Sequence, residues 1–217
     1  MHIFIDSGDI QTIEQALNTG YVYGVTTNPT LLQRANVRIQ QVPSLAKHII
    51  ELGAHELHLQ VYAEDSHQML EDTARLVEID PSRVVIKIPA TPAGFSAAAQ
   101  LVAQGIRVTL TAVYTVAQAV LAMSVGAQYI AVYLGRMRDD GLDSLALVGH
   151  MQRTLNAQHA SVEILAASIR TPVEVEALAE LGIAATTLPL AVIQQLPESS
   201  GTLAAAAAFA TAVRSLQ

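Results

Sequence analysis

The sequence predicts an α/β fold, a single-domain (β/α)8 TIM barrel over residues 1–217 with an extra C-terminal helix at about 202–216. Short β-branched runs alternate strictly with longer helical patterns, which requires parallel strands joined by right-handed crossovers. Eight such runs fit within 217 residues, which favours a closed barrel over the alternative, an open doubly wound sheet. No Gly-x-Gly-x-x-Gly or P-loop motif follows a strand, which weakens a nucleotide-binding interpretation.

The expected strands are short and rich in Val, Ile and aromatic residues, as strands in a barrel wall should be. They are 2–6, 21–26, 56–62, 83–88, 107–111, 129–133, 162–168 and 183–188. Helical patterns are expected between them at 9–17, 66–77, 93–103, 115–125, 143–156 and 173–181. Residues 29–53 predict further helix between the second and third strands, and the alanine-rich C-terminal segment predicts a close-packing helix.

Three strand-to-helix turns carry the same motif. Asn28, Thr91 and Thr171 each precede a proline, which is typical of a capping side chain followed by proline at the first helical position. In a barrel all such turns lie at the face that receives the carboxyl ends of the strands. Barrel enzymes keep their chemistry on that face, so the sequence directs the search for a site there.

Composition narrows the possible partners. A net charge of -7 argues against nucleic acid or an anionic membrane, so an anionic substrate needs locally placed arginines. The absence of cysteine excludes a thiolate nucleophile and cysteine-bound metal, and fits a cytoplasmic location. No basic region with a following apolar segment opens the chain, so no secretory signal is expected. The apolar tail at 203–213 is shorter than the roughly 20 residues that span a bilayer.

One ionisable side chain interrupts a run that otherwise indicates a buried strand. Lys87 follows Val84, Val85 and Ile86, and the alternation of a strand places Val85 and Lys87 on the same face. A lysine removed from water must find a partner or give up its proton. The structural interpretation is a side chain that reaches water or pairs with a carboxylate. The functional interpretation, favoured by the apolar flanks, is an amine nucleophile.

Polar side chains recur where the expected strands end. Each of the first seven strands brings at least one polar side chain to the mouth of the barrel. Strand ends are commonly polar because they reach solvent, but Asp6 and Lys87 both have apolar flanks, so we expect an acid and an amine in one cavity. His55 and His58 should point to opposite faces of their strand, so no metal site is expected. The residues at the mouth are Asp6, Thr26 with Asn28, Gln60, Lys87, Thr111, Tyr133 and Ser168.

Six runs form a recognisable pattern in chain order: Ile5-Asp6, Gly24-Val25-Thr26-Thr27-Asn28-Pro29, Val85-Ile86-Lys87-Ile88-Pro89, Tyr133-Leu134-Gly135-Arg136, Leu165-Ala166-Ala167-Ser168-Ile169-Arg170 and Thr187-Leu188-Pro189-Leu190. Together they resemble the small-subunit transaldolases and fructose-6-phosphate aldolases over nearly the whole chain. The resemblance implies an eight-stranded barrel with a Schiff-base lysine, Lys87, without metal or other cofactor. It also implies a homo-oligomer, a pentamer or decamer, whose C-terminal helix reaches a neighbouring subunit.

The chemistry gives each catalytic candidate a role. Lys87 would attack the ketone of dihydroxyacetone to give an iminium, which loses a carbon-bound proton and adds as an enamine to an aldehyde. Asp6 would hold a donor hydroxyl and move protons. Tyr133 would be the acid/base, directly or through a water held by Gln60 and Thr111.

The remaining candidates bind substrate. Thr26 and Asn28 are expected at the donor. Arg136 and Ser168 lie beside the helix start at Thr171, a place suited to the acceptor phosphate. Arg170 either assists them or is an exposed arginine at the start of a helix.

Gln60 and Tyr133 decide the branch, because the transaldolases carry glutamate and phenylalanine where this chain has glutamine and tyrosine, as the aldolases do. The sequence therefore predicts a class I aldolase that joins dihydroxyacetone or hydroxyacetone to glyceraldehyde 3-phosphate, giving fructose 6-phosphate. A transaldolase that moves the three-carbon unit between sugar phosphates is the alternative. A sugar-phosphate-binding barrel without turnover is the alternative of another class. The expected partners are a small ketone donor and an aldehyde or sugar-phosphate acceptor.

Overall fold

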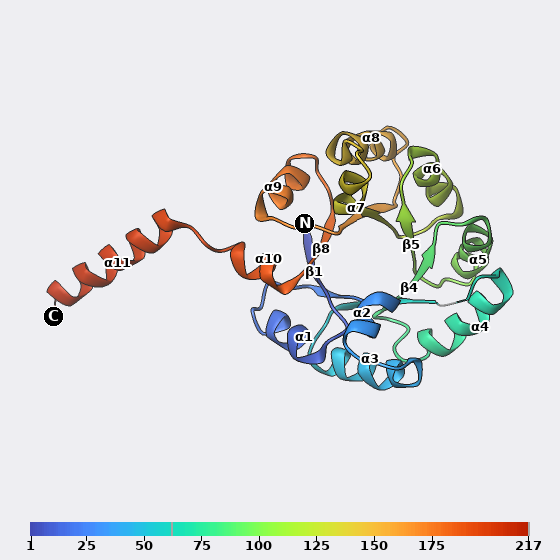
Figure 1. Ribbon diagram of the computed structural model, residues 1–217, viewed down its shortest axis with the longest axis horizontal. Helices are drawn as coiled ribbons and strands as arrows, with labels where there is room; N and C mark the ends of the chain where they lie inside the picture. The colour runs from blue at the N-terminus through green and yellow to red at the C-terminus, as the bar shows by residue number, and fades with distance from the viewer. Residues whose placement is uncertain (62, 217) are drawn as a thin grey trace.

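Eight parallel strands close into one barrel in the computed structural model, which describes residues 1–61 and 63–216 (Figure 1). The strands are β1 (His2–Asp6), β2 (Gly24–Thr26), β3 (Glu56–Gln60), β4 (Val84–Pro89), β5 (Val108–Val113), β6 (Tyr129–Tyr133), β7 (Glu163–Ala167) and β8 (Ala185–Leu188). They pair in chain order, and β1 closes the ring on β8 with Ile5 opposite Leu188. The predicted TIM barrel is confirmed, and the open sheet is excluded.

Helices surround the barrel in Figure 1. They are α1 (Ile10–Leu17), α2 (Pro29–Arg34), the 3₁₀ turn η1 (Ile39–Gln41), α3 (Val42–Glu51), α4 (Ser66–Val77), α5 (Pro92–Ala103), α6 (Val116–Val125), α7 (Leu134–Asp139), α8 (Ser144–Ala157), α9 (Pro172–Glu180), α10 (Leu190–Gln195) and α11 (Ser200–Ser215). Strands 2–6 and 129–133 and helix 66–77 have the expected bounds. The second strand is shorter than expected, the third ends at Gln60, and Tyr62, included in its expected range, lies outside the described residues.

The alternation of β4 separates two regions of core. Val85 belongs to a small cluster inside the barrel, with Phe4 and Leu165, whereas Ile86 and Ile88 pack between the barrel and its helices. Lys87 has the same parity as Val85, so it points inward as expected. The two apolar layers fix the strand in register because a one-residue slip would turn Lys87 outward.

A polar network lies inside the barrel beneath the mouth. His58 is fully buried, and its Nε2 lies 2.9 Å from Glu56 Oε1 while its Nδ1 lies 2.9 Å from Thr109 Oγ1. Burial lowers the pKa of His58, so we assign it as neutral, donating to Glu56 and accepting from Thr109. Burial alone would raise the pKa of Glu56, but its hydrogen bond with His58 and the charge of Arg107 lower that pKa overall. The network therefore keeps a buried carboxylate ionised.

Helix α11 stands apart from the barrel. Figure 1 shows it extending away from the barrel beyond α10, and none of its residues is buried. It exposes four large apolar side chains, Leu203, Phe209, Val213 and, at its C-cap, Leu216. Among the helices of the described residues, none has the length and apolarity to cross a membrane.

Candidate active site

A cavity of about 390 Å³ opens among the carboxyl ends of the strands. Its walls come from the ends of β1 and β4 and from the turns and short helices that follow β2, β6 and β7. Three predicted site residues, Thr26, Thr111 and Gln60, do not line it but lie close to those that do. The other seven line it: Asp6, Asn28, Lys87, Tyr133, Arg136, Ser168 and Arg170.

Lys87 reaches this cavity from the wall of the barrel. Its side chain is 2% exposed, and its Nζ lies 3.4 Å from the carbonyl oxygen of Thr27, a long hydrogen bond. No carboxylate within the described ranges forms a salt bridge with it. The amine is thus held away from bulk water and has no strong bond to break before it meets a carbonyl carbon.

Asp6 is the carboxylate of the cavity, at the end of β1. The hydroxyl of Thr26 donates to its Oδ1 over 2.7 Å, and Thr26 is itself 2.7 Å from the hydroxyl of Thr187. Burial raises the pKa of Asp6, against the lowering effects of Lys87, of the Thr26 hydrogen bond and of Arg136. Thr26 therefore acts on Asp6 in this structure. Thr187, which completes the chain of hydroxyls, was not among the predicted site residues.

Tyr133 and Thr111 form a second pair of hydroxyl groups, on the side of the mouth away from Asp6 and Thr26. Their oxygens lie 2.7 Å apart, at the ends of the neighbouring strands β6 and β5. The register of β5 shifts between Thr111 and Val113, because Ala112 at φ 59 has a left-handed backbone. Such a bulge redirects side chains at the end of a strand, and here it accompanies the contact with Tyr133. The pair brings together two of the predicted proton-transfer residues.

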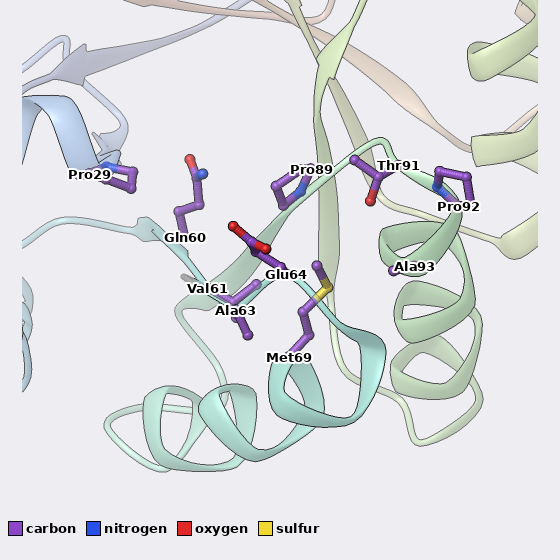
Figure 2. A pocket seen from close by; sticks show the side chains of 10 residues that line it. All are labelled: Pro29, Gln60, Val61, Ala63, Glu64, Met69, Pro89, Thr91, Pro92 and Ala93. Carbon is purple, nitrogen blue, oxygen red and sulfur yellow. The ribbon is translucent and has the colours of Figure 1, made fainter.

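Gln60 faces a second cavity, of about 690 Å³, which adjoins the first at the β2 turn. Gln60 is the strand neighbour of Lys87, but its side chain lies among Pro29, Glu64 and Pro89 (Figure 2). Within the described residues its amide makes no hydrogen bond to Thr111 or Tyr133. The predicted water held jointly by Gln60 and Thr111 therefore stays a prediction.

Asn28 joins the start of α2 to the cavity. Its Oδ1 accepts a hydrogen bond of 3.0 Å from the backbone N–H of Leu31, as expected of an N-cap before proline. The cap leaves the amide Nδ2, a donor, available to a hydroxyl in the cavity. One side chain thus starts the helix and presents a fixed polar group to a ligand.

The far end of the cavity is cationic. The guanidinium carbon of Arg136 lies 4.7 Å from the ring centre of Tyr133, a cation–π geometry. Ser168 has a left-handed backbone at φ 61, and Gly135 donates its backbone N–H to the carbonyl of Ser168 over 3.1 Å. A Cβ at Gly135 would lie 2.5 Å from that carbonyl oxygen. The glycine therefore lets α7 lie against Ser168.

Arg170 is already paired. Its guanidinium donates to both carboxylate oxygens of Asp139, one of them at 2.8 Å, and Asp139 also lines the cavity. Glu174 accepts from the backbone N–H of Arg170 at 2.7 Å and binds Arg138. These contacts hold the turn after β7 against α7, so the structural interpretation of Arg170 and its place in the cavity both apply.

Arg34 was missed because it lies at the last residue of α2, six positions after Asn28, whereas the sequence argument considered strand ends and the residues that closely follow them. Thr187 was missed because the inventory of strand ends stopped at seven strands. The inward parity of Thr187, two residues after Ala185 in β8, could have identified it. His58 is buried in the barrel, and His55, which precedes β3, stacks on Tyr23 outside the cavity. No group of metal-binding side chains occurs among the described residues.

Comparison with known proteins identifies the family to which this chain belongs. The Transaldolase/Fructose-6-phosphate aldolase family model matches residues 3–216, and the chain belongs to this family. A probable transaldolase of Heliobacterium modesticaldum is 34% identical over 196 residues, 90% of this chain and 89% of that protein. A probable transaldolase of Kosmotoga olearia is 36% identical over 90% of this chain and 88% of its own length.

Solved structures extend the likeness of the barrel beyond the family. A mandelate oxidase variant superposes with a TM-score of 0.62, covering 89% of this chain and 67% of the oxidase, at 16% identity. At that identity the likeness concerns the fold alone. The match therefore supports the barrel fold and gives no information about the reaction or substrate of this chain.

Proposed function

We propose that this chain is a transaldolase, which takes a dihydroxyacetone unit from a ketose phosphate onto Lys87 and passes it to an aldose phosphate. The observation that carries the proposal is the presence of Lys87, Asp6 and Tyr133 around one cavity at the mouth of the barrel. Family membership supports sugar-phosphate chemistry, and the relatives named as probable transaldolases support transfer over release. This reverses the order of preference drawn from Gln60 and Tyr133 alone.

The covalent step begins at the amine. Lys87 Nζ adds to the donor ketone, the resulting carbinolamine loses water, and the iminium draws electrons from the neighbouring carbon–carbon bond. That bond breaks, the aldose phosphate leaves as an aldehyde, and the three carbons stay on Lys87 as an enamine. Attack of the enamine on a second aldehyde, followed by hydrolysis of the iminium, releases the new ketose phosphate and frees Lys87.

Two groups can move the protons of these steps. Asp6 faces the cavity with a raised pKa, so it holds a proton more readily than an exposed aspartate and can protonate the departing carbinolamine hydroxyl. The Tyr133 hydroxyl, hydrogen-bonded to Thr111, can relay the proton of the substrate hydroxyl next to the carbon–carbon bond that breaks: it accepts that proton while passing its own to a water molecule in the open cavity. Asn28 offers its amide to a donor hydroxyl, and Arg136 with Ser168 meets the phosphate.

Aldolase release of free dihydroxyacetone is a second candidate function. The hydrogen bond of 2.7 Å between Tyr133 and Thr111 favours it, because an oriented hydroxyl can protonate the enamine and so discharge it. Transfer and release share every step up to the enamine. The two functions therefore differ in the lifetime of that intermediate.

A partition assay tests the proposal. The protein is incubated with fructose 6-phosphate alone, and free dihydroxyacetone is measured before and after a second aldose phosphate is added. A transaldolase keeps the three carbons until the acceptor arrives, whereas release without an acceptor would support the aldolase. Borohydride reduction during the incubation should add a three-carbon unit to Lys87 and abolish activity.

Lysine variants supply the control. Lys87→Met should lose both activities, and Lys47→Met, which changes the other lysine, should keep them. An active Lys87→Met variant, or labelling at Lys47, would contradict Schiff-base catalysis. Substrate binding without turnover or trapping in the wild type would point instead to a sugar-phosphate-binding barrel.

A further inference from the structure

The strongest unassigned feature of the molecule is the cationic character of the cavity. The chain carries 12 lysines and arginines and a net charge of -7, yet four of those cations, Lys87, Arg34, Arg136 and Arg170, line this one cavity. Asp6 and Asp139 are the only carboxylates among its described lining residues. In a protein of negative charge, such a concentration of arginine favours an anionic ligand.

The arginines differ in whether their charge is already neutralised. Arg170 is bound by Asp139, whereas neither Arg34 nor Arg136 forms an ion pair within residues 1–61 and 63–216. Arg136 rests on the ring of Tyr133. Arg34 and Arg136 are therefore the two arginines of the cavity that have no carboxylate partner in the described part of the chain.

These two arginines approach the cavity from opposite sides. Arg34 ends α2, which follows β2, and Arg136 lies in α7, which follows β6. In the closed order of eight strands, β2 and β6 are four positions apart, so their turns face each other across the mouth. Figure 1 shows α2 and α7 on opposite sides of the barrel centre. An anion bound at Arg136 thus has Arg34 on the facing wall.

We propose that Arg34 is a second phosphate-binding residue, which closes on the phosphate of the sugar-phosphate substrate from α2 while Arg136 holds it from α7. The inference rests on the proposed function and adds a specificity-determining residue to it. Guanidinium groups suit this task because their planar donors match the oxygens of a phosphate, and two of them balance its charge of -1.5 to -2 better than one. The sugar then lies between this end of the cavity and Lys87.

The competing explanation is structural. A basic residue in the last turn of a helix stabilises the helix dipole, and Arg34 occupies that position in α2. A dipole partner would affect stability and would treat all substrates alike. A phosphate ligand would affect phosphorylated substrates alone.

The experiment compares acceptors. Arg34→Ala should raise KM for glyceraldehyde 3-phosphate roughly 10- to 100-fold, the loss of one charge-assisted bond, and leave KM for unphosphorylated glyceraldehyde and kcat nearly unchanged. Inhibition by inorganic phosphate should weaken by a similar factor. Arg34→Lys should recover part of the affinity, and Arg34→Gln, which keeps a polar side chain but removes the charge, serves if the alanine variant does not fold.

Arg38→Ala is the matched control. Arg38 lies four residues after Arg34 and lines a different pocket, with Val37 and Ile39, and its replacement by alanine removes the same charge. It should leave both acceptors and phosphate inhibition unaffected. If Arg38→Ala has the same effect as Arg34→Ala, long-range charge explains the result and the inference falls.

A double-mutant cycle with Arg136→Ala tests whether one phosphate is shared. Two residues that bind the same group give losses that do not add, and additive losses would contradict a shared phosphate. Equal loss on both acceptors, or no loss at all, would overturn the role of Arg34. These outcomes are separable from failure of the proposed function, which would show as an active Lys87→Met variant, the absence of a trapped three-carbon unit or release of free dihydroxyacetone without an acceptor.

Discussion

At the scale of single residues, the two hydroxyl contacts at the mouth act on different partners. Thr26 donates to Asp6 and thereby favours its carboxylate form, against burial, which raises its pKa. Thr111 contacts Tyr133, which has no carboxylate beside it among the described contacts. The donor side thus presents a group that can change charge, and the opposite side presents a neutral group that can relay a proton.

Tyr133→Phe separates these roles. It removes the hydroxyl that contacts Thr111 but keeps the ring on which Arg136 rests, so the phosphate end should stay in place. We expect cleavage of fructose 6-phosphate to fall by about 100-fold or more, the usual loss for a general acid/base, with little change in stability. Steady-state kinetics and thermal unfolding measure the two effects.

Tyr114→Phe is the control for this variant, because Tyr114 packs edge-on against Tyr133 at a centroid distance of 6.1 Å but is not part of the proposed machinery. It should leave turnover intact. Combining Tyr133→Phe with Gln60→Glu should raise the ratio of transfer to release. A folded Tyr133→Phe variant with unchanged cleavage would show that the hydroxyl takes no part in proton transfer.

Sequence reasoning found the residues whose signal is local and missed those whose signal is spatial. Lys87 and Asp6 stand out because each is a charge within an apolar run. Arg34 carries no such signal, since an arginine at the end of a short helix is ordinary. Its interest arises only when the closed barrel brings β2 and β6 to facing positions.

At the scale of elements, α7 and α10 were not predicted because neither has a clear local signal in the sequence. Neither α7 nor α10 begins with a side-chain cap: their N-cap residues are Tyr133 and Pro189, which supply none. Both have six residues, too short for a clear helical period. By contrast, α2, α5 and α9 begin at the Asn or Thr caps that the sequence displays, and each was expected.

The packing of α7 on the turn after β7 depends on Gly135. A methyl group there would lie 2.5 Å from Ser168 O and 2.7 Å from Ser168 Oγ, so the backbone would have to move. We expect Gly135→Ala to cost about 1–3 kcal/mol of stability, as overpacking commonly does, and to raise KM for phosphorylated acceptors roughly tenfold or more. Denaturant unfolding and acceptor kinetics would measure both.

Gly201→Ala gives the comparison, since a Cβ at that position of α11 meets nothing nearer than 3.8 Å. It should keep activity and stability. If Gly135→Ala instead behaves like Gly201→Ala, close approach of α7 to Ser168 is not required for the phosphate end.

At the scale of the whole molecule, α11 extends away from the barrel and buries none of its residues against it. We propose, as the family resemblance implies, that its apolar side chains pack on a neighbouring subunit. Phe209→Asp should then lower the oligomeric state measured by light scattering, because Phe209 is 70% exposed in the single chain and would be buried in the assembly. Activity per chain should persist, since all of the described residues that line the cavity belong to the strands, their turns and the short helices α2 and α7, and none belongs to α11.

Val173→Asp is the matched control, because Val173 is 68% exposed and belongs to α9, not to α11. It should leave the oligomeric state unchanged. A monomeric wild type, or an assembly indifferent to Phe209→Asp, would contradict a role for α11 in association.

Because β1, at the start of the chain, pairs with β8, near its end, the site can form only late in synthesis. His2 pairs with Ala185 and Ile5 with Leu188, so β1 lacks one of its two neighbours until β8 has been made. At synthesis rates of about 5–20 residues per second, that delay is on the order of 10–40 seconds. During the later part of this interval Lys87 exists in the chain, but no closed barrel yet holds Asp6 opposite it. Catalytic competence therefore arrives in one late step of chain growth.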